Sequence, residues 1–229
     1  MSQFEKLELL VKDKINDIYK KNVLVIGLGG VGSYAVEALV RSGIQNITIV
    51  DNDTISLSNL NRQLMTYQSN IGKYKTDELE KRILEINPKC RINKVTEFIT
   101  LDNINELFKE DYDYIVDACD TITIKLELIR ISKRKNIKLI SSMGTGNKMD
   151  PSRLKIIDIR KTSYDPIAKI ARKMVKDEKI KGKVMVVCSD EVPYTKVSNV
   201  IPSNSFVPAT AGLLCASFII NDIVGDVYV

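Results

Sequence analysis

The chain has 229 residues, of which 44% are hydrophobic and 28% charged, a composition that fits one large α/β domain over residues 1–229. Its formal net charge is +5 and it has no histidine, which excludes serine–histidine and cysteine–histidine hydrolysis and removes the commonest general acid–base group. Any catalysis is therefore expected to use carboxylates, lysine, arginine, backbone dipoles and a hard cation.

The chain begins with an amphipathic segment, residues 1–21, which has Leu and Ile at helical spacing and lacks the features of a secretion signal. We therefore expect a cytoplasmic protein. An apolar run typical of a buried strand follows at Val23 to Ile26, and a glycine-rich turn separates it from a helical stretch over 34–41. The turn contains Gly27, Gly29, Gly30 and Gly32.

A turn of this kind is suited to binding phosphate. Without side chains its backbone N–H groups can approach a phosphate, and the N-terminus of the following helix adds partial positive charge. A second parallel strand, Ile47 to Val50, ends at Asp51, where an acidic side chain can accept hydrogen bonds from both ribose hydroxyls. The glycines and Asp51 together predict a site for an adenosine nucleotide.

The glycine pattern alone leaves the chemistry open. Most such sites bind NAD or FAD, and glycines also permit a helix to pack closely against a strand. Asn59, Arg62 and Gln63 follow Asp51 closely enough to project towards the same point beyond the strand ends. A dinucleotide would not need these polar groups, whereas a triphosphate would. We therefore expect ATP and keep NAD-dependent oxidoreduction as an alternative.

Further strands are expected near 91–95, 113–117 and 138–142, with helices between them, and then near 153–159 and 184–188, with a closing helix from about 208. This order predicts the α/β class: a doubly wound, mainly parallel, Rossmann-like sheet with a smaller C-terminal extension of strands and a helix. The apolar stretch 208–220 is too short to span a bilayer, so we expect a buried terminal helix and no membrane partner.

Two aspartates follow the apolar run Tyr114 to Val116. Asp117 and Asp120 would lie at the carboxyl edge of the parallel sheet, where such sheets place ligands. Magnesium prefers one or two carboxylates together with phosphate oxygens and water, so a lone aspartate beside a triphosphate is sufficient. Asp117 is alternatively explained as a cap of the next helix.

The four cysteines are far apart and form no C-x-x-C pair, so a tetrathiolate zinc site is not expected. Cys188 ends the apolar run VMVV, and two interpretations are open for it. It is either a reactive thiol at a strand end or a buried small hydrophobe, and we favour the second.

Two basic clusters in the second half of the chain would attract a nucleic-acid backbone, although a solvated helix face explains either cluster equally well. The first is Lys133, Arg134, Lys135 and Lys138, and the second is Lys169, Arg172, Lys173, Lys176, Lys179, Lys181 and Lys183.

Four segments resemble the adenylating core of the ubiquitin-activating enzymes and of the bacterial enzymes that activate sulfur-carrier proteins: VLVIGLGGVGSYAVEALVRSGI, VDNDTISLSNLNRQ, IGKYKTDELEKRILEINPKC and YIVDACDT. They occur in this order over at least residues 21–121. The next stretch, SSMGTGNKMDPSRLKIIDIRKTSYDPIAKIARK, is similar to one branch, the tRNA threonylcarbamoyladenosine dehydratases. The lack of C-x-x-C pairs also favours this branch over the zinc-carrying ones.

The resemblance implies the activity of that branch. There, the carboxylate of a threonylcarbamoyl group on an adenosine beside the anticodon is activated with ATP and cyclised with loss of water. The alternative is adenylation of the C-terminus of a ubiquitin-like sulfur-carrier protein. The resemblance implies cations on the phosphates from Arg62 and Lys75, neutral donors from Asn59 and Gln63, and Mg²⁺ held by Asp120. Lys73 is an alternative for the lysine that contacts the phosphates. Lys75 is favoured because it has the family spacing after Gly72 and would lie at the N-terminal end of a helix that starts near Thr76.

The resemblance also implies partners: a tRNA substrate, a homodimer and a sulfur-transfer accessory protein. The first helix in this family carries an arginine that reaches across the dimer to the partner's ATP, and Lys6 stands near that place. Residues 161–183 are provisionally expected to form a mobile flap over the substrate. A minority interpretation has Cys188 take the acyl group as a thioester.

Overall fold

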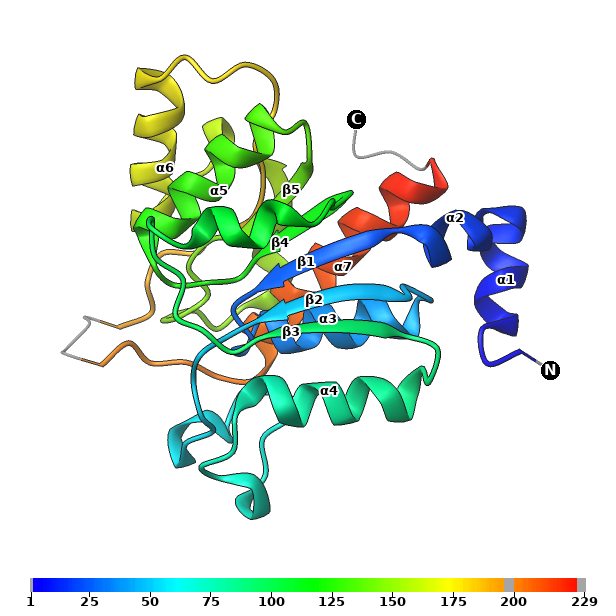
Figure 1. Cartoon of the computed structure of the whole chain (residues 1–229). Coiled ribbons are helices and arrows are strands. Elements are labelled where there is room, and N and C mark those ends of the chain that lie inside the picture. Colours follow the sequence, from blue (N-terminus) through cyan, green and yellow to red (C-terminus); the bar gives the residue numbers. More distant parts are fainter. Residues whose placement is uncertain (1, 196–199, 226–229) are drawn as a thin grey trace.

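A computed structural model describes residues 2–195 and 200–225 of the chain (Figure 1). Within these ranges, strands form one sheet in the order β3–β2–β1–β4–β5–β7–β6, in which only the β6–β7 pair is antiparallel. The strands are β1 (Asn22–Ile26), β2 (Asn46–Val50), β3 (Arg91–Val95), β4 (Tyr114–Asp117), β5 (Lys138–Ser142), β6 (Leu154–Asp158) and β7 (Met185–Ser189). The predicted doubly wound, mainly parallel sheet is confirmed, and the strands of the expected extension join this sheet at one edge.

Helices cover both faces of the sheet (Figure 1). One face carries α3 (Gly32–Arg41), α4 (Lys75–Ile86) and α7 (Phe206–Val224), and the other carries α5 (Ile122–Arg134) and α6 (Pro166–Asp177). The alternation of β1 explains the two layers, since Val23 and Val25 belong to the first core and Leu24 and Ile26 to the second. A strand buried on both faces is apolar throughout.

The N-terminal amphipathic segment forms two short helices rather than one, α1 (Glu5–Val11) and α2 (Ile15–Lys20). A 3₁₀ turn separates them, and Lys12 in this turn has a φ of +54°. Ile15 and Ile18 are buried in the first core, whereas Leu9 and Leu10 on α1 are exposed. In Figure 1, α1 lies at the opposite end of the sheet from the carboxyl ends of the parallel strands.

The closing helix α7 has 19 residues and is longer than the predicted stretch 208–220. By length and composition alone such a helix could cross a membrane, so the expectation that it is too short is wrong, although core helices have the same composition. It packs against α3, and a Cβ on Gly212 would lie 2.2 Å from the Val31 carbonyl oxygen. Val207, Ala211 and Ile219 are fully buried, as expected for a buried terminal helix.

Candidate active site

A cavity of about 470 Å³ lies at the carboxyl ends of β1, β2 and β4. Because β2 and β4 flank β1 on opposite sides, the chain reverses its winding here, and doubly wound sheets bind ligands in the resulting crevice. The predicted site residues line the cavity with one exception, Gly32. Those that line it are Gly27, Gly29, Gly30, Asp51, Asn59, Arg62, Gln63, Lys75 and Asp120.

The glycines of the turn have different tasks. Gly27 has a φ of +87°, which favours glycine, and a Cβ there would lie 2.6 Å from the Ala118 carbonyl oxygen. A Cβ on Gly32 would lie 1.8 Å from the Gly27 carbonyl oxygen, so packing alone requires this residue. Gly29 and Gly30 face the cavity. The backbone of Gly29 and Gly30 is therefore placed where it could approach a phosphate, whereas close packing explains Gly27 and Gly32.

The carboxylate of Asp51 is held by backbone N–H groups. Its Oδ2 accepts a hydrogen bond from the Leu28 N–H at 2.7 Å, and its Oδ1 accepts one from the Asp53 N–H at 2.8 Å. Burial raises the pKa of Asp51, although nearby Lys75 and these two N–H groups oppose the rise. The side chain is thereby fixed at the cavity wall, where carboxylate lone pairs can still accept hydroxyl groups.

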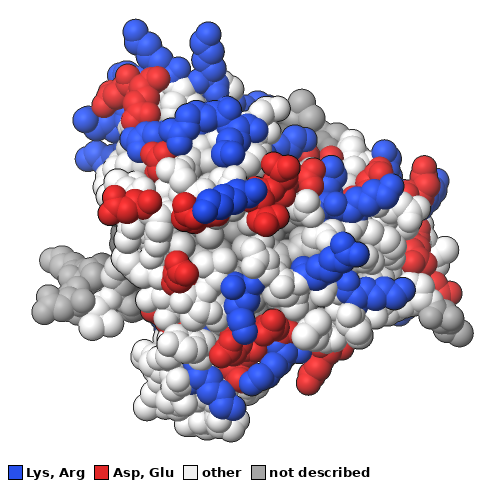
Figure 2. Space-filling view, viewed as in Figure 1, with Lys and Arg blue, Asp and Glu red and all other residues white. Residues whose placement is uncertain are grey.

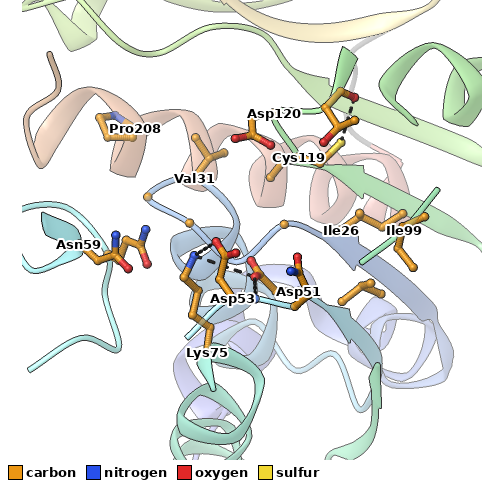
Figure 3. A pocket seen from close by; sticks show the side chains of 18 of the residues that line it. Ile26, Val31, Asp51, Asp53, Asn59, Lys75, Ile99, Cys119, Asp120 and Pro208 are labelled. Carbon is orange, nitrogen blue, oxygen red and sulfur yellow. Dashed lines mark hydrogen bonds and ion pairs between the residues drawn. The ribbon is translucent and has the colours of Figure 1, made fainter. Parts of the chain in front are cut away.

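An apolar wall lies beside this carboxylate. Figure 3 shows Ile26 and Ile99 next to Asp51, and Val50 and Ile124 also line the cavity. Phe98 lines it as well and is 58% exposed. An apolar wall adjoining a carboxylate suits a flat base attached to a ribose. The sequence reasoning missed these residues because isolated apolar side chains look the same whether they line a core or a cavity.

Lys75 is the first residue of α4, within one residue of the predicted helix start. Its Nζ lies 2.6 Å from Asp53 Oδ2 and 3.9 Å from Asp51 Oδ1 (Figure 3). The rival Lys73 lies 3.9 Å from Glu78 and does not line the cavity. Asp53 was missed by the sequence reasoning, although its position two residues after Asp51 was an available signal.

Asn59, Arg62 and Gln63 lie on a 3₁₀ segment, Leu57–Asn59, and the turn after it. The guanidinium group of Arg62 donates hydrogen bonds to Ser58 O at 2.8 Å and Asn61 Oδ1 at 2.9 Å, and no carboxylate pairs with it within the described ranges. The Gln63 side chain is buried, and its Oε1 has no hydrogen-bond partner among the residues that the structure describes. Such unused polar groups at a cavity indicate a polar ligand.

Asp120 lies on the loop after β4 and, in Figure 3, on the other side of the cavity from Lys75. Its side chain is exposed and has no ion pair in residues 2–195 and 200–225. No group of three or more Cys, Asp or Glu in these ranges is arranged to hold a metal. The protein donor that the described residues offer here is the single exposed carboxylate of Asp120, and Mg²⁺ beside a triphosphate takes one or two carboxylates together with phosphate oxygens and water.

Asp117 does not cap α5, so that prediction is wrong. Its Oδ2 accepts hydrogen bonds from Lys125 Nζ at 2.8 Å and Ser141 Oγ at 2.5 Å, and all three side chains are buried. Its Oδ1 accepts one from the Cys119 N–H at 3.3 Å. Burial by itself would lower the pKa of Lys125, but nearby Asp117 outweighs this effect and raises that pKa above its usual value. Asp117 thus anchors the loop that carries Asp120.

The sequence reasoning also missed Lys125. This lysine lies on α5 at helical spacing with buried Leu128, Ile129 and Ser132, so its position on the core-facing side of the helix was visible in the sequence. A charged residue on such a face requires a buried partner. The partner, Asp117, lies eight residues earlier, on β4.

The cysteines offer no activated thiol near the cavity. Cys188 is buried in β7, burial raises its pKa to about 12, and it does not line the cavity. This agrees with the favoured interpretation of a small buried hydrophobe. Cys119 lines the cavity, but burial and nearby Asp117 raise the pKa of its thiol as well.

The segment 161–183, provisionally expected to be a flap, contains α6. Ala168, Ala171 and Val175 of this helix are buried in the second core, and none of the residues 161–183 lines the cavity. Beyond α5, the residues that line the cavity are Thr145, Ser203 and Pro208. In the structure this segment includes a helix whose apolar side is buried in the second core, and its role as a flap over the substrate stays a prediction.

Comparisons with known proteins agree with this geometry. Residues 2–221 match a family model described as the ThiF family. A curated relative from Bacillus subtilis (strain 168), named tRNA threonylcarbamoyladenosine dehydratase, is 38% identical over 245 residues, which cover 99% of this chain and 96% of the relative. A relative of the same name from Haemophilus influenzae is 40% identical over 170 residues, which cover 74% of this chain and 65% of the relative.

A solved structure is similar over nearly the whole chain. It is E. coli tRNA N6-threonylcarbamoyladenosine dehydratase, TcdA, in complex with ATP, with a TM-score of 0.90 and 32% sequence identity. The match covers 97% of this chain and 94% of the other. The complex of the same protein with AMP has a TM-score of 0.91.

Proposed function

The chain belongs to the ThiF family, and from this premise we propose that it is an ATP-dependent tRNA threonylcarbamoyladenosine dehydratase. It adenylates the carboxylate of the threonylcarbamoyl group and promotes cyclisation with loss of water. One observation carries the proposal. The cavity gathers the carboxylate of Asp51, the backbone of Gly29 and Gly30 and two cations, Arg62 and Lys75. The chain is also similar over most of its length to dehydratases, one of them solved with ATP.

The first step joins two anions. A carboxylate oxygen of the substrate attacks the α-phosphorus of ATP, an oxygen–phosphorus bond forms, and pyrophosphate leaves with the negative charge. Cations on the phosphates lower this barrier more than proton transfer does. Lys75 Nζ, at 2.6 Å from the exposed Asp53, and the guanidinium group of Arg62 supply them. Gln63 and Asn59 add neutral hydrogen bonds to the same ligand.

Asp120 is the residue that would hold Mg²⁺. The ion would add positive charge beside the triphosphate, which the lone carboxylate of Asp120 cannot supply. Asp117 supports this role by anchoring the loop through the Cys119 N–H.

The second step is intramolecular. A nitrogen or oxygen of the same threonylcarbamoyl group attacks the acyl adenylate, loses its proton, and AMP leaves with the former carboxylate oxygen. Groups held within one molecule have a high effective concentration, so the protein needs to supply little beyond orientation. No covalent enzyme intermediate is required, which is consistent with the burial of Cys188.

The finer assembly belongs to the same proposal. A homodimer would bring Lys6 of one chain towards the partner's cavity, because α1 lies at the far end of the sheet from the cavity of its own chain (Figure 1). The exposed Leu9 and Leu10 on α1 are consistent with such contact. A cytoplasmic location and a sulfur-transfer accessory protein remain part of the proposal, and sedimentation and co-purification test the assembly.

The decisive experiment uses the purified chain with ATP, Mg²⁺ and bulk tRNA that carries threonylcarbamoyladenosine. We expect AMP and pyrophosphate, and by mass spectrometry a nucleoside lighter by one water. Formation of ADP, or no use of ATP, would contradict adenylation. Pyrophosphate exchange that requires a sulfur-carrier protein instead of tRNA would favour the alternative substrate. Tight NADH binding without ATP turnover would favour oxidoreduction.

A further inference from the structure

Positive charge is concentrated in one part of the chain. Residues 161–183 contain eight Lys or Arg and three Asp or Glu, an excess of +5 that equals the net charge of the whole protein. The rest of the chain is therefore balanced. Seven lysines of this segment are exposed. We call the six from α6 onward the α6 strip: Lys169, Lys173, Lys176, Lys179, Lys181 and Lys183.

The charge of the α6 strip is hardly neutralised. Within the described part of the chain, only Lys173 of the strip forms an ion pair, at 3.3 Å from Asp177. The two other acidic residues of the segment are engaged elsewhere. Asp165 is buried and caps α6 through the Ala168 N–H, and Glu178 pairs with Arg130 of α5 at 2.6 Å.

The other basic cluster is different. All four of its side chains have partners within the protein, so the structure distinguishes two clusters that the sequence alone left equal. The partners are Lys183 O for Lys133, Glu127 for Arg134, Phe108 O for Lys135 and Asp222 for Lys138.

The α6 strip starts near the rim of the cavity. Asp165, the N-cap of α6, packs against Gly144: a Cβ added to this glycine would lie 2.7 Å from Asp165 Oδ2. Thr145, the residue after Gly144, lines the cavity. From there α6 extends roughly 18 Å, given its 12 residues, and the chain continues to the amino end of β7. Lys169, Lys173 and Lys176 share the exposed side of α6, and Figure 2 shows Lys and Arg side chains gathered over this helix.

We propose that the α6 strip binds the sugar–phosphate backbone of tRNA while the modified adenosine reaches the cavity. The proposal rests on the proposed function, because it takes tRNA as the substrate. A row of exposed lysines that leads away from the cavity, of which only Lys173 has an ion pair within the described ranges, suits a stem whose phosphates repeat along its length. Each lysine that contacts a phosphate releases a counterion, so the binding depends strongly on salt.

The test compares two triple variants with the unaltered protein. The first is Lys169→Gln, Lys173→Gln and Lys176→Gln. The matched control is Lys20→Gln, Lys89→Gln and Arg91→Gln, which removes three exposed cations that adjoin one another beside the amino ends of the strands. Within the described ranges none of these three has an ion pair, and of the three α6 lysines only Lys173 has one. Binding of bulk tRNA is measured over a range of salt concentrations, together with tRNA-dependent AMP formation and the KM for ATP.

We expect the α6 variant to bind tRNA roughly tenfold to a hundredfold more weakly, with a salt slope smaller by about two to three. Its KM for ATP should not change, since no residue of the strip lines the cavity. Unaltered tRNA binding, or an equal loss in the control, would overturn the docking face alone. If the unaltered protein neither binds tRNA nor forms AMP with it, the proposed function fails as well. Circular dichroism checks that both variants are folded.

Discussion

Two lysine–aspartate pairs near the carboxyl edge of the sheet differ in how exposed their aspartates are. Lys125 and Asp117 are completely buried, and both also form a hydrogen bond with Ser141. We therefore interpret this pair as one that stabilises the fold. Lys75 pairs with Asp53, whose side chain is 59% exposed, at the wall of the cavity. A pair with an exposed partner can exchange that partner for a ligand phosphate, whereas a pair enclosed on all sides cannot.

The largest effect is expected from Lys125→Met. This change leaves Asp117 as a buried charge without its counterion, which typically costs about 3–5 kcal/mol in the free energy of unfolding. Urea denaturation at neutral pH measures the loss. The double variant Lys125→Met, Asp117→Asn removes both charges and should recover part of it. A loss below about 1 kcal/mol in the single variant would mean that the Lys125–Asp117 pair contributes little to the stability of the fold.

Lys75→Met should have the opposite profile. The rate of tRNA-dependent AMP formation should fall about a hundredfold to a thousandfold, because a cation on the phosphates is lost. The free energy of unfolding should change by less than about 1 kcal/mol, since Asp53 is exposed and Asp51 keeps two backbone donors. Lys73→Met is the matched control and should keep full activity. Equal losses in both variants would remove the distinction between the two lysines.

Asp120→Asn tests the other side of the cavity. We expect the Mg²⁺ concentration for half-maximal activity to rise at least about tenfold. Loss of a group that only orients a metal ligand typically lowers metal affinity by that much, and loss of the ligand itself should lower it at least equally. Stability should not change, since Asp120 is exposed. A titration of activity against Mg²⁺ gives the answer, and an unchanged titration curve would assign the ion to other groups.

The smallest effect is expected from Cys188→Ala. The thiol is buried in β7, burial raises its pKa to about 12, and it lies outside the cavity. Its loss should leave AMP formation within about twofold of the unaltered rate. Loss of activity in a variant with unchanged stability would revive the thioester interpretation. Mass spectrometry of the protein after turnover, searched for an acyl adduct on this cysteine, provides an independent reading.

The predictions from sequence were strongest where local pattern and topology agree. The strands at 46–50 and 138–142 form at the predicted positions and are largely buried, because apolar runs bounded by turns form buried strands. The strand at 91–95 also forms where it was predicted, as a mostly exposed strand at the edge of the sheet. The candidate site residues after β1, β2 and β4 line one cavity for a related reason, since parallel strands place their carboxyl ends at one edge.

The predictions were weakest where one residue type serves two purposes. Asp117 and Asp120 both follow an apolar run, yet one is buried against Lys125 and the other faces the cavity. Gly29 and Gly32 belong to one motif, yet only the first lines the cavity. Residues 161–183 have the composition of an exposed segment, but the apolar side of α6 is buried in the core.

Local periodicity and residue chemistry are enough to predict the class of fold, the glycine-rich motif and the set of charged groups. Which of those groups are enclosed and which line the cavity depends on the packing of the folded chain. Burial and pairing arise between segments distant along the chain, such as Asp53 with Lys75 or Glu178 with Arg130. Charged residues of one type therefore stabilise the fold where they are enclosed and line the cavity where they are not.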